Sequence, residues 1–320
     1  MSTITNDIHL ALARLKNDDI VAIPTETVYG LAGSVVSGVA IRKVYATKHR
    51  PTNHPLIMHV AAQWDLSQWV SYIPDYAYTL MEAFWPGPLT LIFPLKPGSV
   101  NPLVTGGQNT IAIRAPNHVL AQELLLQLGQ PLAAPSANPY GKISPTTAEH
   151  VQHSFPNDDF LILQGGRCAI GLESTIVSAL DRQKYQILRQ GVIDASHIAA
   201  KIASPCKTDE TDIRVPGAML YHYQPEKKLY YFNDRQAIEY FLSGHQKIPY
   251  VFTFSKKYHD ASVLSYQFSE QSDDAAYEFY YRLRIADEST ADVILMELPA
   301  KTDRWMALRE KIVKAGRPMN

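Results

Sequence analysis

The segment IVAIPTETVYGLAG, residues 20–33, joins a short apolar run to a polar hook that ends in two glycines. Ile20–Pro24 has the length and the β-branched composition of a buried strand. The hook places hydroxyl and carboxylate groups directly after it: Thr25, Glu26, Thr27 and Tyr29. Polar groups at the end of a buried strand suit a binding site, and Gly30 and Gly33 are predicted to let the chain turn away from that site.

The chain as a whole is long enough for more than one domain. It has 320 residues, 46% of them hydrophobic, which predicts two globular units with sizeable cores. Eighteen of the 21 prolines fall at or before Pro225. The polar, proline-punctuated stretch 204–227 reads as a linker between a catalytic domain at 1–203 and a smaller domain at 228–320.

The two units differ in their predicted secondary structure. In residues 1–203 the strands and helices do not alternate strictly, so a twisted mixed sheet flanked by helices is expected. Residues 228–320 predict strand, helix, strand, strand, helix, strand and helix, which is a small Rossmann-like α/β domain. The predicted fold class is therefore α/β with a second, smaller α/β domain.

The bulk properties narrow the function classes. Lysine and arginine number 30 against 31 acidic residues, so any nucleic-acid surface must be a local patch. Cys168 and Cys206 are the only cysteines, which favours a reducing compartment and argues against a structural zinc site. No stretch has the roughly 20 apolar residues of a membrane span, and the amino terminus lacks a signal-peptide pattern. We expect a soluble, cytoplasmic protein with no membrane contact.

The stretch KHRPTNHPL, residues 48–56, carries two cations at a turn. Lys48 and Arg50 stand at the end of a predicted helix, just before Pro51. Two cations on a turning backbone can converge on one polyanion. Helix capping is the alternative, because cations at a carboxyl terminus favour the helix dipole.

Two strand-associated motifs carry further candidates. In TIAIRAP, Thr110, Ala112 and Arg114 alternate with two isoleucines, so Arg114 would face a cavity if the isoleucines face the core; a solvated sheet face is the alternative. In APSANPYGKISPT, Ser136 and Asn138 follow an apolar strand, where turn chemistry explains them equally well.

The remaining motifs are weak when taken singly. They are GLESTIV at 171–177, ILRQG at 187–191 and PGAMLYHYQP at 216–225, which contains His222 and Tyr223. No GxxxxGK[ST] phosphate loop is present. His54 and His59 have no carboxylate or thiol at ligand spacing, so no protein-built metal site is predicted.

Taken in order, eight stretches resemble the motif series of the YrdC-like threonylcarbamoyl-AMP synthases in their long, two-domain (Sua-five type) form. The stretches are PTETVYGL, KHRPTNHPL, FWPGPLTL, TIAIRAP, APSAN, GLESTI, ILRQG and PGAMLYHYQP. The resemblance covers roughly residues 5–225, and the carboxy-terminal tail also looks like that form.

The resemblance implies a nucleotidyltransferase that makes threonylcarbamoyl-AMP and pyrophosphate from ATP, L-threonine and bicarbonate, with Mg²⁺ accompanying ATP. Lys48 and Arg50 are the implied catalytic residues. The implied ATP site comprises Lys48, Arg50, Thr110, Ala134, Ser136, Asn138, Ser144, Arg189 and Tyr223. Threonine would be held by Thr25, His59, Arg114 and Ser174. His222 and Tyr223 would close over the cavity as a lid.

The implied partners lie downstream of the reaction. Other proteins would transfer the threonylcarbamoyl group to an adenosine beside the anticodon of transfer RNA, and a weak contact with transfer RNA is left open. The sequence departs from the family pattern at four places. His54 replaces the usual asparagine, Tyr140 a common serine and Gln190 a usual proline, and the lid methionine is displaced by one position.

Two other functions compete with this interpretation. Carbamoyl transfer through carbamoyl-adenylate, as in the YrdC-like module of hydrogenase-maturation proteins, would use a similar site, although that machinery normally carries zinc fingers for which this chain has too few cysteines. A non-catalytic RNA-binding module would also use a basic cavity, and the near-neutral net charge counts against it.

Overall fold

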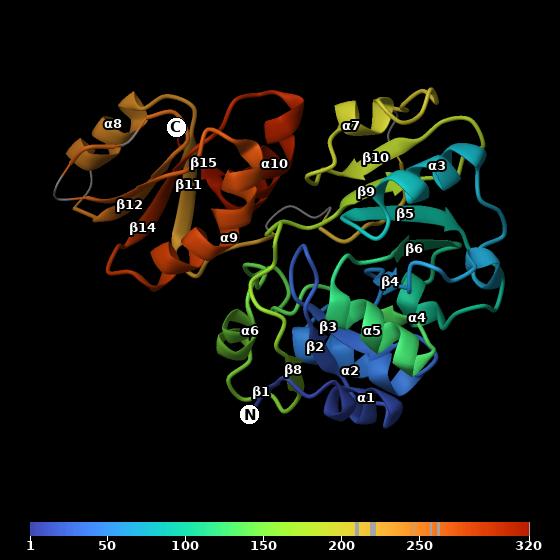
Figure 1. Cartoon of the computed structure of the whole chain (residues 1–320). Coiled ribbons are helices and arrows are strands. Elements are labelled where there is room, and N and C mark those ends of the chain that lie inside the picture. Colours follow the sequence, from blue (N-terminus) through green and yellow to red (C-terminus); the bar gives the residue numbers. More distant parts are fainter. Residues whose placement is uncertain (209–210, 218–221, 245, 257, 261–262, 320) are drawn as a thin grey trace.

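The computed structural model describes residues 1–320 except 209–210, 218–221, 245, 257, 261–262 and 320. The chain forms two lobes, and the segment after α7 runs between them (Figure 1). The larger lobe contains the amino terminus and the smaller contains the carboxy-terminal helices. No helix in the described residues has both the length and the apolar character needed to cross a bilayer.

The larger lobe is built on a ten-stranded mixed sheet, as predicted, in the order β1-β8-β2-β3-β7-β4-β6-β5-β9-β10. The sheet contains both parallel pairs, such as β4 with β6, and antiparallel pairs, such as β5 with β6. The strands are β1 (Thr3–Thr5), β2 (Val21–Ile23), β3 (Gly30–Ser34), β4 (Ile57–His59), β5 (Leu89–Pro94), β6 (Thr110–Arg114), β7 (Leu132–Ala133), β8 (Leu161–Leu163), β9 (Thr175–Ser178) and β10 (Gln186–Arg189).

Helices and short 3₁₀ turns accompany this sheet (Figure 1). They are α1 (Ile8–Lys16), α2 (Gly38–Lys48), η1 (Leu66–Gln68), α3 (Asp75–Phe84), α4 (Pro102–Thr105), α5 (Val119–Leu128), α6 (Ala148–Ser154) and α7 (Ala195–Ala199). Helix α2 matters most for the site. Ser37 caps its start by accepting from the N–H of Ala40 at 3.1 Å, and His49 ends it in the left-handed conformation with φ 52°.

The glycines of the opening segment do not turn the chain, so that prediction was wrong. Gly30 and Gly33 lie inside β3, which pairs antiparallel with β2 and β7. A Cβ atom on Gly30 would lie 3.1 Å from the Cβ of Ala134, and one on Gly33 would lie 3.1 Å from a methyl of Val44. Glycine therefore allows close packing at both positions, against the residue after β7 at Gly30 and against α2 at Gly33.

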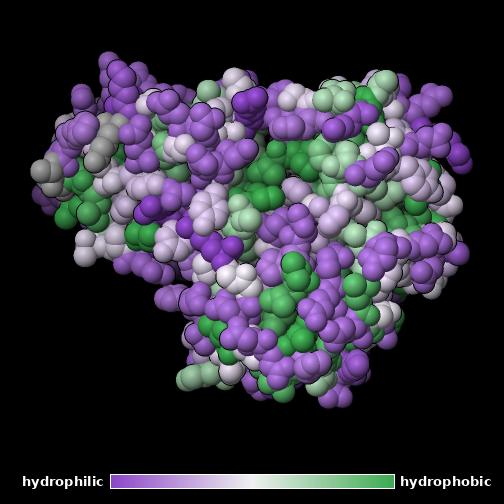
Figure 2. All heavy atoms as spheres, viewed as in Figure 1, coloured by the Kyte–Doolittle hydropathy of each residue, from purple (hydrophilic) through white to green (hydrophobic). Residues whose placement is uncertain are grey.

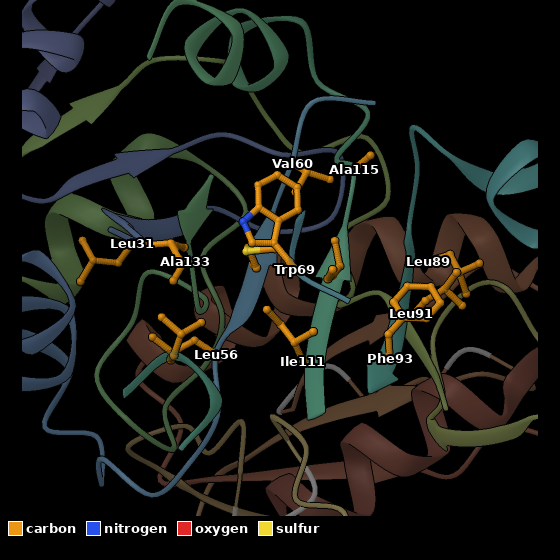
Figure 3. Close-up of a cluster of buried hydrophobic side chains, with 14 of the residues drawn as sticks. Leu31, Leu56, Val60, Trp69, Leu89, Leu91, Phe93, Ile111, Ala115 and Ala133 are labelled. Atoms are coloured by element: carbon orange, nitrogen blue, oxygen red, sulfur yellow. The ribbon is translucent and has the colours of Figure 1, made fainter. Parts of the chain in front are cut away.

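The strands bury alternating side chains against the helices. Leu89, Leu91 and Phe93 of β5 belong to the same buried cluster as Ile111 of β6 and Leu31 of β3 (Figure 3). Ile113 belongs to this cluster as well, whereas Ala112 packs in a separate cluster with Ile92 of β5. The predicted two-faced character of the 110–114 strand is confirmed, because its isoleucines are core residues.

The smaller lobe is a five-stranded, wholly parallel sheet in the order β13-β12-β14-β11-β15. The predicted succession of elements in 228–320 is confirmed, with one further strand and a 3₁₀ turn. The elements are β11 (Lys228–Phe232), α8 (Gln236–Gly244), β12 (Pro249–Thr253), β13 (Leu264–Gln267), α9 (Ser272–Glu288), β14 (Val293–Glu297), η2 (Asp303–Trp305), α10 (Met306–Ala315) and β15 (Arg317–Pro318).

The two lobes share buried side chains. Tyr280 and Phe279 of α9 lie in one hydrophobic cluster with Val28 and Leu172 of the larger lobe and with Tyr223 of the linker. Hydrophilic residues dominate the face in Figure 2, and one of its hydrophobic patches lies where the lobes meet. Helices α9 and α10 therefore pack against residues of the larger lobe and the linker at this junction.

Candidate active site

A cavity opens at one edge of the ten-stranded sheet and extends beneath the linker. Its volume is about 570 Å³, including the open space at its mouth. His59 and Arg114 end the parallel strands β4 and β6 and are direct register partners, so their side chains enter from the same edge. Ser174 precedes β9, Arg189 ends β10, and Thr25 follows β2.

Most residues of the predicted site line this cavity. These are Thr25, Arg50, His59, Arg114, Ala134, Ser136, Ser174, Arg189 and Tyr223. Four predicted residues are not in its wall: Lys48, Thr110, Asn138 and Ser144. Thr110 begins β6 and pairs with Pro94, at the opposite end of the strand from Arg114. The strand that presents Arg114 to the cavity therefore carries Thr110 away from it.

Two guanidinium groups are fixed in the cavity wall by carbonyl oxygens. Arg50 donates from Nη2 to Pro55 O at 2.9 Å. Arg189 donates from Nε and Nη2 to Ser174 O at 3.0 and 2.9 Å, and from Nη1 to Pro216 O at 3.1 Å. Burial lowers the pKa of the Arg50 guanidinium, with a smaller contribution from the charge of Arg189. Carbonyl dipoles orient these cations without cancelling their charge.

Lys48 lies just behind the wall. It is 2% exposed, and its ammonium donates to the carbonyls of Ser136 and Asn138, so it does not act as a solvated helix cap. Burial, and then the charge of Arg50, lowers the pKa of Lys48 well below its usual value. Within the described residues, no carboxylate forms an ion pair with Lys48, Arg50 or Arg189. The region behind and around Ser136 is therefore a cationic pocket.

Arg114 has a carboxylate partner that sequence reasoning did not assign. Its Nη2 lies 2.7 Å from Oε2 of Glu26, and the side chains are only 5% and 6% exposed. Its Nε donates to Gly87 O at 3.2 Å. The Oε1 atom of Glu26 is buried without a hydrogen-bond partner among the described residues. Glu26 is part of the hook at residues 25–29, but a local sequence pattern cannot show that it pairs with Arg114, 88 positions away.

Two of the threonine-side candidates, Thr25 and His59, are neutral and hydrogen-bonded to the main chain. Thr25 donates its hydroxyl to Val28 O at 2.7 Å and accepts from the N–H groups of Thr27 and Val28, so it organises the hook itself. His59 Nδ1 lies 3.2 Å from Ile57 O, which fixes this nitrogen as the donor. Burial and then Arg114 lower the pKa of His59 to about 3, so the imidazole is neutral and Nε2 is an acceptor.

The smaller lobe contacts this cavity through another residue that sequence reasoning missed. Glu173 lines the cavity and accepts from Ser144 Oγ at 2.5 Å and from Tyr280 Oη at 2.8 Å. Ser144 therefore supports the wall through Glu173. The bond to Tyr280 connects helix α9 directly to the cavity floor.

The described parts of the linker form the roof. Pro216, Gly217, His222 and Tyr223 all line the cavity. Tyr223 is held with φ 67°, a left-handed conformation that is uncommon for a bulky residue. The predicted lid segment therefore lines the cavity on both sides of residues 218–221, through Pro216 and Gly217 before them and His222 and Tyr223 after them. The displaced methionine, Met219, lies outside the described residues.

Two departures from the family pattern contact each other beside this roof. Tyr140 Oη lies 2.9 Å from His54 Nδ1, and the guanidinium of Arg50 lies 5.6 Å from the Tyr140 ring. The ring of Tyr140 also meets that of His222, with centroids 5.7 Å apart. His54 and Tyr140 therefore form a pair of rings that packs edge-on against His222 through Tyr140.

The described residues around the cavity do not form a metal centre. In the described part of the chain, no three histidine, cysteine or carboxylate side chains cluster as ligands. Glu173, a carboxylate in the cavity wall, is engaged by Ser144 and Tyr280, and Glu26, which stands behind the wall, is engaged by Arg114. A divalent cation there would need its ligands from a bound substrate and water.

The structure is that of a two-domain α/β protein. A cationic cavity lies at the strand ends of the mixed sheet, and the linker to the parallel-sheet domain covers it. A family model described as "Telomere recombination" (Sua5, YciO and YrdC) matches residues 13–191. A second, described as "Threonylcarbamoyl-AMP synthase, C-terminal domain", matches residues 184–316.

Individual proteins agree with these models. The threonylcarbamoyl-AMP synthase of Bacillus subtilis is 37% identical over 99% of this chain and 94% of its own length. That of Schizosaccharomyces pombe is 32% identical over 94% of this chain and 86% of its own. The crystal structure of Pyrococcus abyssi Sua5 complexed with L-threonine superposes with a TM-score of 0.87 and 29% identity, covering 100% of this chain and 98% of that one. This chain belongs to the threonylcarbamoyl-AMP synthase family, in its long two-domain form.

Proposed function

We propose that the protein is an L-threonylcarbamoyladenylate synthase, a nucleotidyltransferase that converts ATP, L-threonine and bicarbonate into threonylcarbamoyl-AMP, pyrophosphate and water. One observation carries the proposal. Lys48, Arg50 and Arg189 are held by main-chain carbonyls beside a single cavity, which leaves their positive charge available to anions. The names of the full-length relatives support the same activity.

ATP would occupy the cationic side of the cavity. A triphosphate near Arg50 and Arg189 would stabilise the charged form of Lys48, because an anion offsets the cost of burying an ammonium group. Ser136 and Ala134 in the wall allow close approach of the ligand. Lys48 and Arg50 would then stabilise the negative charge that develops as pyrophosphate leaves.

Threonine would occupy the opposite side. Arg114 keeps Nη1 free of the two contacts described above, so it can hold the substrate carboxylate while Glu26 fixes its plane. Neutral His59 would accept a hydrogen bond from the amine or hydroxyl, and Ser174 would add a hydroxyl. A pKa of about 3 makes His59 a positioning residue and a poor base.

The chemistry needs proximity and the exclusion of water. The amine nitrogen of threonine bonds to the carbon of bicarbonate or carbon dioxide, and the carbamate oxygen then attacks the α-phosphorus as the bond to pyrophosphate breaks. No covalent enzyme intermediate is required. Orientation of such reactants is worth about 7–11 kcal/mol. The linker flanks at Gly217 and Tyr223 would protect the carbamate and the mixed anhydride from hydrolysis.

Mg²⁺ would enter as part of the substrate, bound to the phosphates of ATP. The described residues offer it no ligand cluster, so no step is assigned to it. The product would pass to other proteins that modify transfer RNA. Both cysteines are free thiols, in keeping with a reaction in the cytoplasm.

The decisive experiment measures pyrophosphate release with ATP and bicarbonate, comparing threonine, serine and no amino acid. Release that depends on threonine, together with threonylcarbamoyl-AMP identified by mass spectrometry, is the expected result. Release without an amino acid but with carbamoyl phosphate would instead support carbamoyl transfer. Salt-dependent RNA binding without any turnover of ATP would leave only the RNA-binding alternative.

A further inference from the structure

Helix α10 of the smaller lobe contacts both ends of the cavity roof and the strand end that carries Arg189. The contacts come from three charged residues on one side of the helix: Glu310, Lys311 and Lys314. Lys311 is fully buried, and the side chain of Glu310 is 20% exposed. Charged groups are rarely buried at a domain junction unless each has a partner.

The first contact fixes the residue after Arg189. Glu310 Oε2 accepts from the main-chain N–H of Gln190 at 3.1 Å, and Lys311 Nζ donates to the carbonyl of the same residue at 3.0 Å. Both main-chain polar groups of Gln190, in the peptide units on either side of its Cα, are thus held by one helix. A proline at this position, which the family resemblance led us to expect, would have no N–H to donate.

The second contact fixes the roof. Lys314 Nζ donates to Gly217 O at 2.5 Å and to Glu310 Oε1 at 2.7 Å. The carbonyl of Lys314 accepts from His222 N at 3.0 Å, and Lys311 lies 5.3 Å from the ring centroid of Tyr223. Burial alone would raise the pKa of Glu310, but Lys311 and Lys314 outweigh it and hold that pKa below its usual value. The carboxylate is therefore ionised and clamps both lysines.

We propose that Glu310, Lys311 and Lys314 are positioning residues for ATP, which hold Arg189 and the linker flanks at Gly217 and Tyr223 in the geometry that receives the nucleotide. The proposal rests on the proposed function, and it makes the smaller lobe part of the ATP site. Threonine binding should depend on it far less, because Arg114 and His59 are positioned by β6 and β4 within the larger lobe.

The test compares Lys314→Met and Glu310→Gln with Arg309→Met in the full-length protein. Arg309 is the matched control because it lies on the same helix but bonds to Pro299 within its own lobe. We expect the first two variants to weaken ATP binding in calorimetry, and to raise the KM for ATP, by about five- to tenfold. Threonine affinity should change by less than about twofold, and Arg309→Met should match the unmodified protein.

Two further variants separate positioning from folding. Lys314→Arg keeps a cation able to reach Gly217 and should restore most of the ATP affinity. In a double-mutant cycle, the loss for Gln190→Pro combined with Glu310→Ala should be smaller than the sum of the two single losses, because both variants remove the bond between Gln190 N–H and Glu310. Gln190→Ala keeps the N–H and should have little effect. The inference is overturned if folded Lys314→Met and Glu310→Gln bind ATP as tightly as Arg309→Met. If the unmodified protein binds ATP but makes no threonylcarbamoyl-AMP, the proposed function is wrong. The ATP affinities of the variants would still test the positioning role of Glu310, Lys311 and Lys314.

Discussion

Replacing one member of the Arg114–Glu26 pair is expected to cost far more stability than replacing both. The Nη2–Oε2 distance is 2.7 Å, and the side chains are 5% and 6% exposed, so neither charge reaches bulk water. Two unit charges at that distance attract by about 6 kcal/mol at an effective dielectric constant of about 20. Desolvation offsets much of this attraction. Removing a single partner still costs about 3–5 kcal/mol, because the other charge stays buried and unpaired.

The assay is urea unfolding, followed by tryptophan fluorescence, of Arg114→Met, Glu26→Gln and the double variant. Each single variant should lose about 3–5 kcal/mol of unfolding free energy, and the double variant should lose less than either. A double variant whose loss equals the sum of the two single losses would refute the reasoning.

The same variants test the substrate role of Arg114. Arg114→Met should raise the KM for threonine much more than the KM for ATP, because the guanidinium is expected to hold the amino-acid carboxylate. Glu26→Gln keeps that guanidinium and removes a competing negative charge, so the threonine KM should not rise. Equal increases in both KM values for Arg114→Met would contradict the carboxylate role.

Three further outcomes are expected. Arg50→Ala should lower pyrophosphate release by about 100-fold or more while the circular dichroism melting curve is retained, and unchanged turnover would remove Arg50 from the site. Tyr280→Phe should cost about 1.5–3 kcal/mol in thermal or urea unfolding, because Glu173 loses a buried donor, and an unchanged midpoint would show that the bond contributes nothing. Burial and then Arg284 lower the pKa of His150 to about 3, so the unfolded state takes up this proton first and stability falls as the pH drops below about 6.5. His150→Gln should therefore make the acid-side loss shallower by up to about 1.4 kcal/mol per pH unit between pH 5.5 and 4, and an identical slope would count against the shift.

The sequence alone determined the features that are written in neighbouring residues. The two-residue period of 110–114 predicted that the two isoleucines share one face and Arg114 lies on the other, because a strand alternates its side chains whatever surrounds it. The missing alternation of strands and helices predicted a mixed sheet, and the ordered motifs predicted the family. The roles of the individual site residues stay predictions.

Only the tertiary structure shows which residues far apart in the sequence are in contact, because a local sequence pattern depends on neighbouring residues alone. Lys48 donates to the carbonyls of Ser136 and Asn138, and Thr110 lies at the opposite end of β6 from Arg114 and the cavity. Glu310 reaches Gln190 across 120 positions. A carboxylate on a helix has the same local pattern as a solvated surface residue, so only the packing of the two lobes shows the link between Glu310 and the cavity roof.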